Sequence, residues 1–247
     1  MAIIMAMKAM ILKITPEILR LIAEVDEFKG QWQGLKELAP DRLVALKRVA
    51  TIESVGSSTR IEGVKLTDAE IGALLSGLKI QPFGSRDEEE VAGYAALMEM
   101  VFESFGGIPL DEDHIKQLHR VLLKYSSKDV RHLGEYKKFP NRVEVFDEEG
   151  KSLGVIFEPA SPFETPSRMK ELLEWFNDEE NVKDLHPLLR ISVFVIWFLA
   201  IHPFQDGNGR LARALTTLLL LQNGYAYVPF SSLERIVEEN KDRYYQF

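Results

Sequence analysis

Apolar side chains recur at intervals of three and four residues along most of the chain, and this spacing predicts a mainly helical protein. The expected helices begin at N-cap residues or first-turn prolines and end at glycine or asparagine signals. They cover residues 17–28, 40–55, 67–75, 86–105, 111–124, 165–177, 187–201, 208–223 and a last helix from 231 onward. That last helix still continues at Phe247, so the ending looks unfinished and suggests a missing C-terminal module.

One stretch departs from the helical spacing. Apolar and polar residues alternate in Asn141–Phe146 and Leu153–Phe157, and the turn sequence Asp147–Gly150 separates them, which is typical of a β-hairpin. The predicted fold is therefore all-α with one projecting β-hairpin. No linker is long enough to mark a domain boundary, and we expect an N-terminal helical region (1–85) and a core (86–247) to form one compact unit.

Composition excludes several classes of function. A net charge of −8 argues against direct nucleic-acid binding, because neutralising phosphates needs a surplus of Lys and Arg. The lack of cysteine rules out disulfides and thiolate chemistry and is compatible with a cytoplasmic location. The apolar run Ile191–Ile201 is well short of the roughly 20 residues of a membrane span, and the N-terminus lacks a signal-peptide pattern. We therefore expect a soluble cytoplasmic protein.

The chemically richest segment is His202–Arg213. An apolar helix ends where it starts, and a new helix is expected near Asn208, whose free N–H groups and dipole favour an anion in the intervening loop. Gly207 and Gly209 would let the backbone approach a phosphate closely. Asp206 could hold Mg²⁺ against the same phosphates, since this ion prefers one or two carboxylates plus phosphate oxygens.

Two arginines and a histidine complete this segment. Arg210 and Arg213 lie one helical turn apart and offer two planar forks for phosphate oxygens. His202 can accept a proton from an attacking hydroxyl, because the ordinary pKa of histidine is about 6.5. Each feature alone is more often a cap, a turn or a solvated face. Their occurrence together, in this order, favours a site for nucleotide phosphates and proton transfer.

A dinucleotide-binding loop is the main competing interpretation, since Gly207–Ala212 fits the pattern G-x-G-x-x-A. That fingerprint directly follows a strand, whereas here the loop His202–Asp206 intervenes and no βαβ pattern precedes it. The sequence also lacks the Walker pattern G-x-x-x-x-G-K-[ST]. Both nucleotide-binding folds are therefore rejected.

The segment His202–Arg213 matches H-x-F-x-[DE]-G-N-G-R-x-x-R at every defined position, and the chain thereby resembles the Fic family over about residues 15–247. The resemblance implies an enzyme that transfers AMP from ATP, with Mg²⁺, to a Ser, Thr or Tyr hydroxyl of a target protein. It makes 86–247 the Fic core, and the predicted hairpin (141–157) resembles the Fic flap, on which the target would dock. The target could be the chain itself, and a homodimer is one assembly left open.

The resemblance also implies individual roles. His202 would be the general base, and Asp206 would ligate Mg²⁺ between the α- and β-phosphates. Asn208, together with the amides around Gly207 and Gly209, would hold the α-phosphate. Gly209 stands where family members that act as kinases carry Lys, which favours nucleotidyl transfer.

Further nucleotide contacts follow from the same resemblance. Arg210 would hold the β- and γ-phosphates, and Arg213 the γ-phosphate. Tyr244 and Tyr245 resemble the tyrosine pair of the following Fic helix and could stack near the adenine. One departure concerns the flap: many Fic proteins carry Arg after Gly-x-Tyr just before it, whereas Lys137 occupies this position here, which puts the flap geometry in question.

A second motif lies far from the first. Ser58 and Glu62 are four residues apart and would share one face of a helix that Gly63 ends. Alone this is an ordinary helix end, but next to a Fic core it matches the inhibitory pattern [ST]-x-x-x-E-[GN]. A Glu62 carboxylate paired with Arg213 would occupy the fork that the γ-phosphate needs. The sequence therefore predicts a self-inhibited adenylyltransferase.

Three alternatives stay open. In some family members the equivalent glutamate positions a water that removes AMP, so Glu62 and His202 could run the reverse reaction. Another nucleotide or phosphate-bearing group could be transferred instead. A regulatory module that senses ATP through a degenerate site is the alternative outside enzymology, although the intact motif argues against it.

Overall fold

The structure, a computed structural model, describes residues 13–38, 40–77, 82–128, 131–141, 143–146 and 152–241. Within these ranges the chain is mostly helical, as the hydrophobic spacing predicts. The α-helices are α2 (Pro16–Leu38), α3 (Pro40–Ile61), α4 (Asp68–Gly77), α5 (Arg86–Ser104), α6 (Glu112–Leu122), α7 (Thr165–Asn177), α8 (Glu179–Asp184), α9 (Pro187–Ile201), α10 (Asn208–Gln222) and α11 (Leu233–Glu239). Two short 3-10 helices, η1 (Phe105–Gly107) and η2 (Val228–Phe230), join them.

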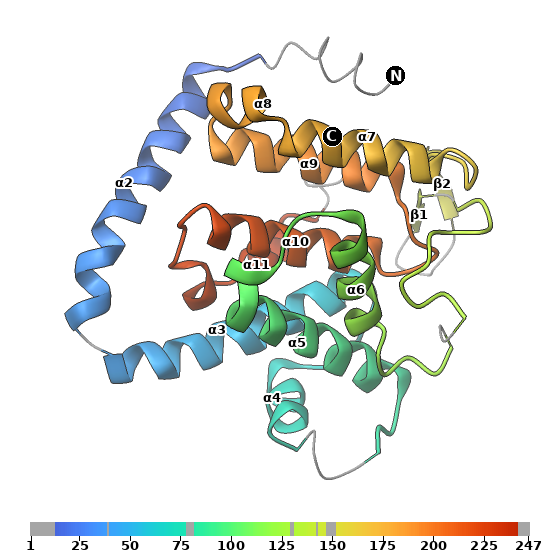
Figure 1. Ribbon diagram of the computed structural model, residues 1–247. Helices are drawn as coiled ribbons and strands as arrows, with labels where there is room; N and C mark the ends of the chain where they lie inside the picture. Colours follow the sequence, from blue (N-terminus) through green and yellow to red (C-terminus); the bar gives the residue numbers. More distant parts are fainter. Residues whose placement is uncertain are drawn as a thin grey trace.

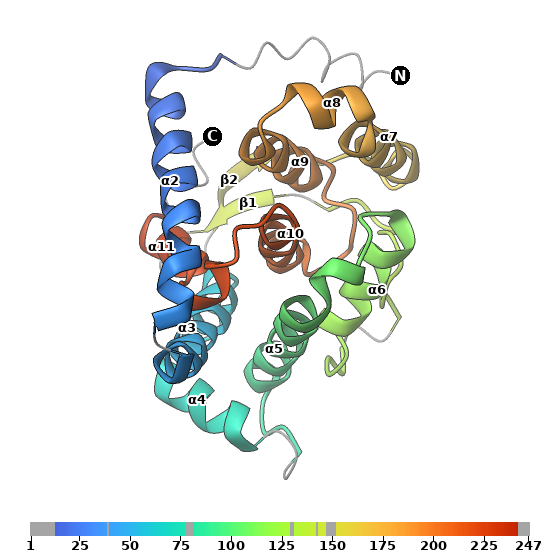
Figure 2. The same ribbon diagram turned by 60° about the vertical axis from the view of Figure 1, so that its left-hand side comes forward.

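Helix α10 lies at the centre of the molecule, with α7 and α9 above it and α5 and α6 below it in the first view (Figure 1, Figure 2). Buried residues occupy every turn of α10, from Asn208 to Leu221. A helix that is buried on all sides belongs to the interior of a protein. The core therefore surrounds the helix that carries the second half of the predicted motif.

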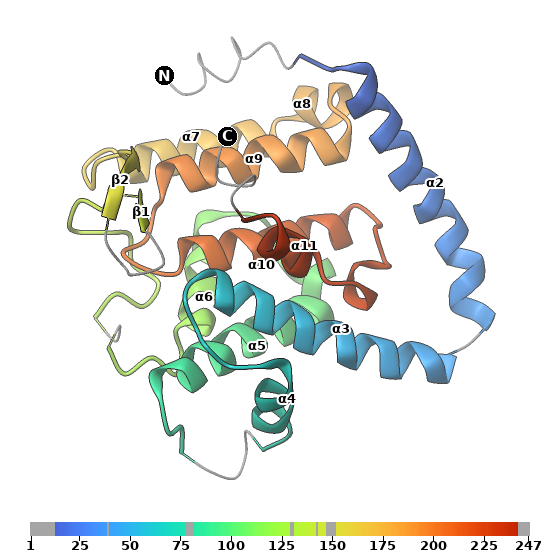
Figure 3. The same ribbon diagram turned by 180° about the vertical axis from the view of Figure 1, so that it is seen from behind.

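Helix α9 forms the apolar wall above α10 and ends at Ile201, directly before His202. Its fifteen residues fall short of the roughly 20 that cross a bilayer. Of the helices described, none has the length and apolarity of a membrane span. From behind, α3 runs alongside α11 and reaches α10 (Figure 3). The two predicted motifs, one ending α3 and one beginning α10, thus meet at the centre of the fold.

Local capping explains where several helices begin. Thr67 and Glu70 exchange three hydrogen bonds of 2.7–3.3 Å, which is the predicted capping box ahead of α4. The Asp111 carboxylate accepts from a backbone N–H in the first turn of α6. His186 caps α9, and a proline follows at its first position, where a missing N–H costs nothing.

Some boundaries differ from the predictions. Helix α2 continues past Gly30, because Trp32 is buried against Phe230 and this packing outweighs the poor helix propensity of glycine. Helix α3 extends six residues beyond its predicted end at 55. Helix α11 ends at Glu239, where the N–H of Asn240 closes the final turn, and the predicted helical stretch from 242 to Phe247 lies outside the described residues. The predictions also lack the short helix α8.

Two strands occupy the region of alternating residues. Strand β1 (Val143–Phe146) pairs antiparallel with β2 (Ser152–Phe157), and Val143 lies opposite Phe157. The predicted turn residues 147–150 lie outside the described residues. The pairing therefore occurs where a hairpin is expected, while a projecting flap remains a prediction.

Candidate active site

His202 stands at the carboxyl end of α9 in a left-handed conformation, with φ 52° and ψ 61°. Among the described residues it is the one non-glycine residue with positive φ. A left-handed residue with a side chain costs about 1–2 kcal/mol, so the surroundings must hold it there. Its N–H donates to the Phe198 carbonyl at 2.9 Å, which closes the last turn of the helix. Strain of this kind gathers at functional sites.

Asn208 closes the loop that follows. Its Oδ1 accepts from the N–H of Phe204, and its Nδ2 donates to the carbonyl of the same residue, both at 2.8 Å. Phe204 itself is fully buried. Gly207 has φ 80°, and a Cβ there would come within 2.9 Å of Leu122. The side chain of Asn208 thus shapes the loop, which leaves the backbone N–H groups at the start of α10 as the natural donors to an anion.

His119 supports the loop from below, and sequence reasoning missed it. The ring is completely buried and stacks on Phe204, with centroids 3.9 Å apart and planes 9° from parallel. The N–H of Gly134 donates to Nδ1 at 3.0 Å, which leaves Nε2 to donate to the Asp206 carbonyl, also at 3.0 Å. His119 therefore fixes the backbone of the proposed metal ligand. Its position in the last turn of α6 gives no sequence signal of this role.

Arg210 and Asp206 form part of a charge cluster. The Arg210 guanidinium, 2% exposed, donates to Asp206 at 3.1 Å and to Glu90 of α5 at 3.0 Å. Arg86 bonds the same Glu90 at 2.7 Å and lies 3.7 Å from Asp206. Sequence reasoning placed Arg210 with the β- and γ-phosphates but missed Glu90 and Arg86. The cluster keeps the Arg210 guanidinium beside the Asp206 carboxylate.

Arg213 meets the distant motif, as the sequence predicts. Its Nε donates to the Ser58 hydroxyl, and its Nη2 donates to the Ser58 carbonyl and to the Glu62 carboxylate, each at 2.8 Å. The Glu62 carboxylate also lies directly over Gly209, so close that any Cβ at Gly209 would collide with its Oε1. The end of α3 thus places a negative charge at the N-terminus of α10, where the dipole favours an anion.

Electrostatics keeps the candidate base neutral. Burial, followed by the positive charge of Lys137, lowers the pKa of His202 to about 4. The Leu199 carbonyl and the carboxylates of Glu62 and Asp206 act in the opposite direction but are outweighed. At neutral pH the imidazole is therefore unprotonated, which is the form that accepts a proton. Tyr244 and Tyr245 lie outside the described residues, so their predicted stacking on adenine stays a prediction.

Residues 109–220 match the Fic/DOC family. The chain contains a Fic domain. The matched range includes the motif His202–Arg213, whereas Ser58 and Glu62 precede it. The protein adenylyltransferase fic-1 of Caenorhabditis elegans is 30% identical over 169 residues, which are 67% of this chain and 30% of that protein. The chain spans less than half the length of this relative and of the Fic adenylyltransferase of Drosophila mojavensis.

Solved structures share the fold of this Fic protein. A Fic-domain-containing signaling protein from Bacteroides thetaiotaomicron has a TM-score of 0.72 at 29% identity, covering 90% of this chain and 80% of that one. A Fic family protein from Desulfovibrio desulfuricans has a TM-score of 0.75 at 26% identity, covering 95% and 66%. The likeness therefore extends well beyond the matched range, into the helices that precede it.

Proposed function

We propose that this Fic protein transfers AMP from ATP to a Ser, Thr or Tyr hydroxyl of a target protein, and that Glu62 keeps the resting site closed. The hydroxyl oxygen would attack the α-phosphorus, and the bond from that phosphorus to the oxygen bridging the β-phosphate would break. His202 would take the hydroxyl proton, and pyrophosphate would leave. The curated relatives named as protein adenylyltransferases and the neutral imidazole support this reaction.

Asp206 suits a Mg²⁺ ion that is bound together with ATP. Magnesium commonly takes one or two carboxylates and completes its shell with phosphate oxygens and water. No group of three or more acidic or histidine ligands occurs in the described part of the chain, so the phosphates would supply the remaining ligands. The bound ion would contribute positive charge that stabilises the phosphates, and Arg86 and Arg210 would turn from Asp206 toward them.

The observation that carries the inhibitory part is the ion pair of Glu62 with Arg213 over Gly209. In this position the carboxylate holds the fork proposed for the γ-phosphate and repels the phosphate that approaches it. ATP could then bind only with its phosphates displaced. A misplacement of about 1 Å can cost on the order of a hundredfold in rate, which is enough to silence the enzyme.

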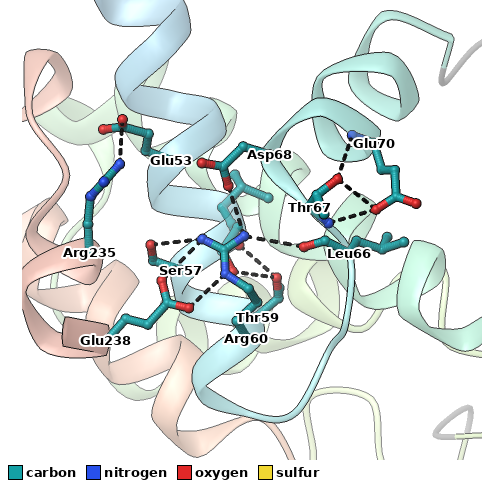
Figure 4. A network of polar contacts seen from close by, with 12 residues as sticks. Glu53, Ser57, Thr59, Arg60, Leu66, Thr67, Asp68, Glu70, Arg235 and Glu238 are labelled. Atoms are coloured by element: carbon teal, nitrogen blue, oxygen red, sulfur yellow. Dashed lines mark hydrogen bonds and ion pairs between the residues drawn. The ribbon is translucent and has the colours of Figure 1, made fainter.

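Contacts on both sides of α3 hold its last turns in place (Figure 4). Arg60 donates to both oxygens of Glu238 in α11, at 2.7 and 3.1 Å, and to Asp68 at 2.8 Å. Arg235 of α11 pairs at 2.8 Å with Glu53, which precedes Arg60 in α3 (Figure 4). The last stretch of α3 is thereby clamped to α11 and to the start of α4, two residues before the carboxylate that closes the site.

The two strands supply a place for the target. A segment of the target protein could add to the edge of β1 or β2 through main-chain hydrogen bonds. This would place a hydroxyl above His202, because the chain leading into β1 is bonded to the loop beside it: the Lys137 N–H donates to the Pro203 carbonyl at 2.9 Å. The target could be another protein or a second copy of this chain.

Incubation of a native lysate with α-labelled ATP and Mg²⁺ tests the proposal. Glu62→Gly should label itself or a lysate protein far more strongly than wild type, and Glu62→Gly/His202→Ala should not. The matched control is Glu103→Gly, which removes an exposed glutamate near the end of α5 and should behave like wild type. Equal labelling by wild type and Glu62→Gly would refute the inhibition.

The same experiment separates the alternatives. Label from γ-labelled but not α-labelled ATP would identify a kinase. Loss of pre-formed label that requires Glu62 would identify the reverse reaction. Absence of transfer by every variant, together with measurable ATP binding, would favour an ATP-sensing module instead.

A further inference from the structure

Lys137 is a buried lysine, 3% exposed, in the segment that leads from α6 to β1. In the described chain its ammonium has no carboxylate partner. It donates instead to the Ile201 carbonyl at 3.0 Å and to Oδ1 of Asn141 at 2.9 Å. Burying a charge is costly unless its surroundings compensate, and these two acceptors stabilise the buried ammonium.

The first acceptor belongs to the end of α9. The last carbonyls of a helix lack partners within the helix, and the dipole places partial negative charge there. The ammonium of Lys137 satisfies the carbonyl of Ile201 and adds a favourable charge at this end. The next residue is His202 in its left-handed conformation. Lys137 therefore holds the peptide from which the candidate base projects.

The second acceptor belongs to the approach to β1. The Oδ1 of Asn141 accepts a hydrogen bond from the Lys137 ammonium, and its Nδ2 donates to the Phe204 carbonyl at 3.1 Å. A bridge between Tyr136 and Phe204 and the bond from the Lys137 N–H to Pro203 join the same two segments. Residues 136–141 are thus fastened to both halves of the loop 201–204.

We propose that Lys137 is a positioning residue: its ammonium sets the orientation of His202 and, through Asn141, joins the catalytic loop to the strands proposed to receive the target. The second half of this inference rests on the proposed function. The first half does not, because the environment of the His202 ring can be measured without any reaction.

The charge of Lys137 also acts on His202 directly. Among the described residues, the charged groups that act on His202 are Lys137, Glu62 at the end of α3, and Asp206 in the loop. The lysine disfavours protonation of the ring, and the two carboxylates favour it. Burial lowers the pKa of Lys137 to about 8, so the ammonium is still charged at neutral pH.

Titration of the imidazole by NMR in wild type, Lys137→Met and Lys137→Arg decides the first half. The chain has 5 histidines, and a His202→Asn variant assigns the resonance of interest. Lys137→Met should raise the pKa of His202 toward its ordinary value of about 6.5, whereas Lys137→Arg, which keeps the charge, should leave it low. If Lys137→Met does not fold, Lys137→Gln keeps a donor for Ile201 without the charge. An unchanged His202 pKa in the uncharged variant would overturn the proposal.

Kinetics in the Glu62→Gly background tests the second half. Lys137→Met should lower kcat by about tenfold to a hundredfold, since misplacement of a reacting group is expensive, and should leave the KM for ATP nearly unchanged. Lys137→Arg should restore most of kcat. Asn141→Ala keeps the charge, so it should raise the KM for the target while the His202 titration stays as in wild type. Equal effects of Asn141→Ala and Lys137→Met on that titration would contradict the assigned roles.

If no variant transfers AMP, the proposed function fails, yet the titration still tests the positioning of His202. If the pKa of His202 rises in Lys137→Met as expected but no variant transfers AMP, Lys137 is retained as the residue that positions His202. If AMP is transferred but the pKa of His202 does not change in Lys137→Met, the proposed function stands and Lys137 loses that role. The two failures are therefore distinguishable.

Discussion

His202 and Glu62 face the same end of α10, but different kinds of contact hold them. The loop of His202 is fixed by buried groups, mostly neutral: the Asn208 amide, the stacked His119 and main-chain hydrogen bonds. The end of α3 that leads to Glu62 is fixed to α11 through partly exposed ion pairs, in which the Arg60 and Glu238 side chains are 25% and 28% exposed. Buried neutral bonds are insensitive to salt, whereas exposed ion pairs contribute little and are screened.

This difference suggests how the protein would be regulated. A signal that weakens the clamp on α3 could release Glu62 without disturbing the bonds that hold the loop of His202, because Glu62 contacts this region at Arg213 and Gly209 and takes no part in those bonds. Helix α11 is the element through which such a signal would pass, since it supplies Glu238 and Arg235. The comparison therefore predicts that damage to the loop destroys activity, while damage to the clamp raises it.

Asn208→Ala should have the largest effect. It removes both bonds to Phe204 and leaves a buried N–H and carbonyl without that partner, which costs about 1–3 kcal/mol in the free energy of unfolding. Transfer by Glu62→Gly/Asn208→Ala should fall on the order of a hundredfold through misplacement of the loop. Denaturant unfolding and initial rates measure both. Asn177→Ala, which loses two carbonyl contacts far from the loop, should lower stability and spare the rate.

The low pKa of His202 predicts a pH effect on stability. With a pKa of about 4 in the folded protein and about 6.5 when unfolded, the unfolded chain binds this proton first as the pH falls. Wild type should therefore lose roughly 3 kcal/mol relative to His202→Asn between pH 7 and 4. Unfolding of both proteins at several pH values isolates the difference, because their carboxylates titrate alike. Parallel stability curves would show that the ring is not held neutral.

Arg60→Met should activate the enzyme. Without the bonds to Glu238 and Asp68, the end of α3 loses its clamp, and we expect labelling from α-labelled ATP to rise about tenfold, the effect of roughly 1.4 kcal/mol. Arg20→Met, which breaks an exposed pair on α2, is the matched control and should have no effect. A labelling rate no higher than that of wild type would separate the clamp from the inhibition.

Salt should produce the smallest effect. Raising the ionic strength from about 0.1 M to 1 M shortens the screening length from roughly 10 to 3 Å and should weaken the pairs of α3 with α11. The ratio of the wild-type rate to the Glu62→Gly rate should then rise about twofold to threefold, as expected for pairs worth less than about 1 kcal/mol. The ratio cancels the effect of salt on ATP itself. A constant ratio would show that exposed ion pairs do not set the inhibition.

The sequence predicted most helix starts, because Thr67, Asp111 and Pro187 carry local signals that do not depend on the rest of the fold. It also predicted the meeting of Glu62 with Arg213, through the resemblance of two separate motifs to one family. Each of these capping signals and motifs lies within a dozen consecutive residues. They are readable without a three-dimensional arrangement.

Other parts of the site depend on contacts between distant segments. Glu90 reaches Arg210 across 120 positions of sequence, and the buried His119 reaches the Asp206 carbonyl across 87. Nothing local distinguishes Glu90 from the acidic residues beside it in the first turns of α5. The continuation of α2 past Gly30 has the same origin, because Trp32 packs against the distant Phe230. These features depend on packing between distant segments, which local sequence patterns do not predict.

Calorimetric titration of ATP and ADP tests most directly whether Glu62 occupies the place of the γ-phosphate. His202→Ala and His202→Ala/Glu62→Gly are compared, so that no turnover disturbs the measurement. Removal of Glu62 should tighten ATP binding by about tenfold or more, the value of one charge-assisted contact of 1.5–3 kcal/mol, and should leave ADP binding nearly unchanged. An equal gain for both nucleotides, or no gain for ATP, would contradict the account.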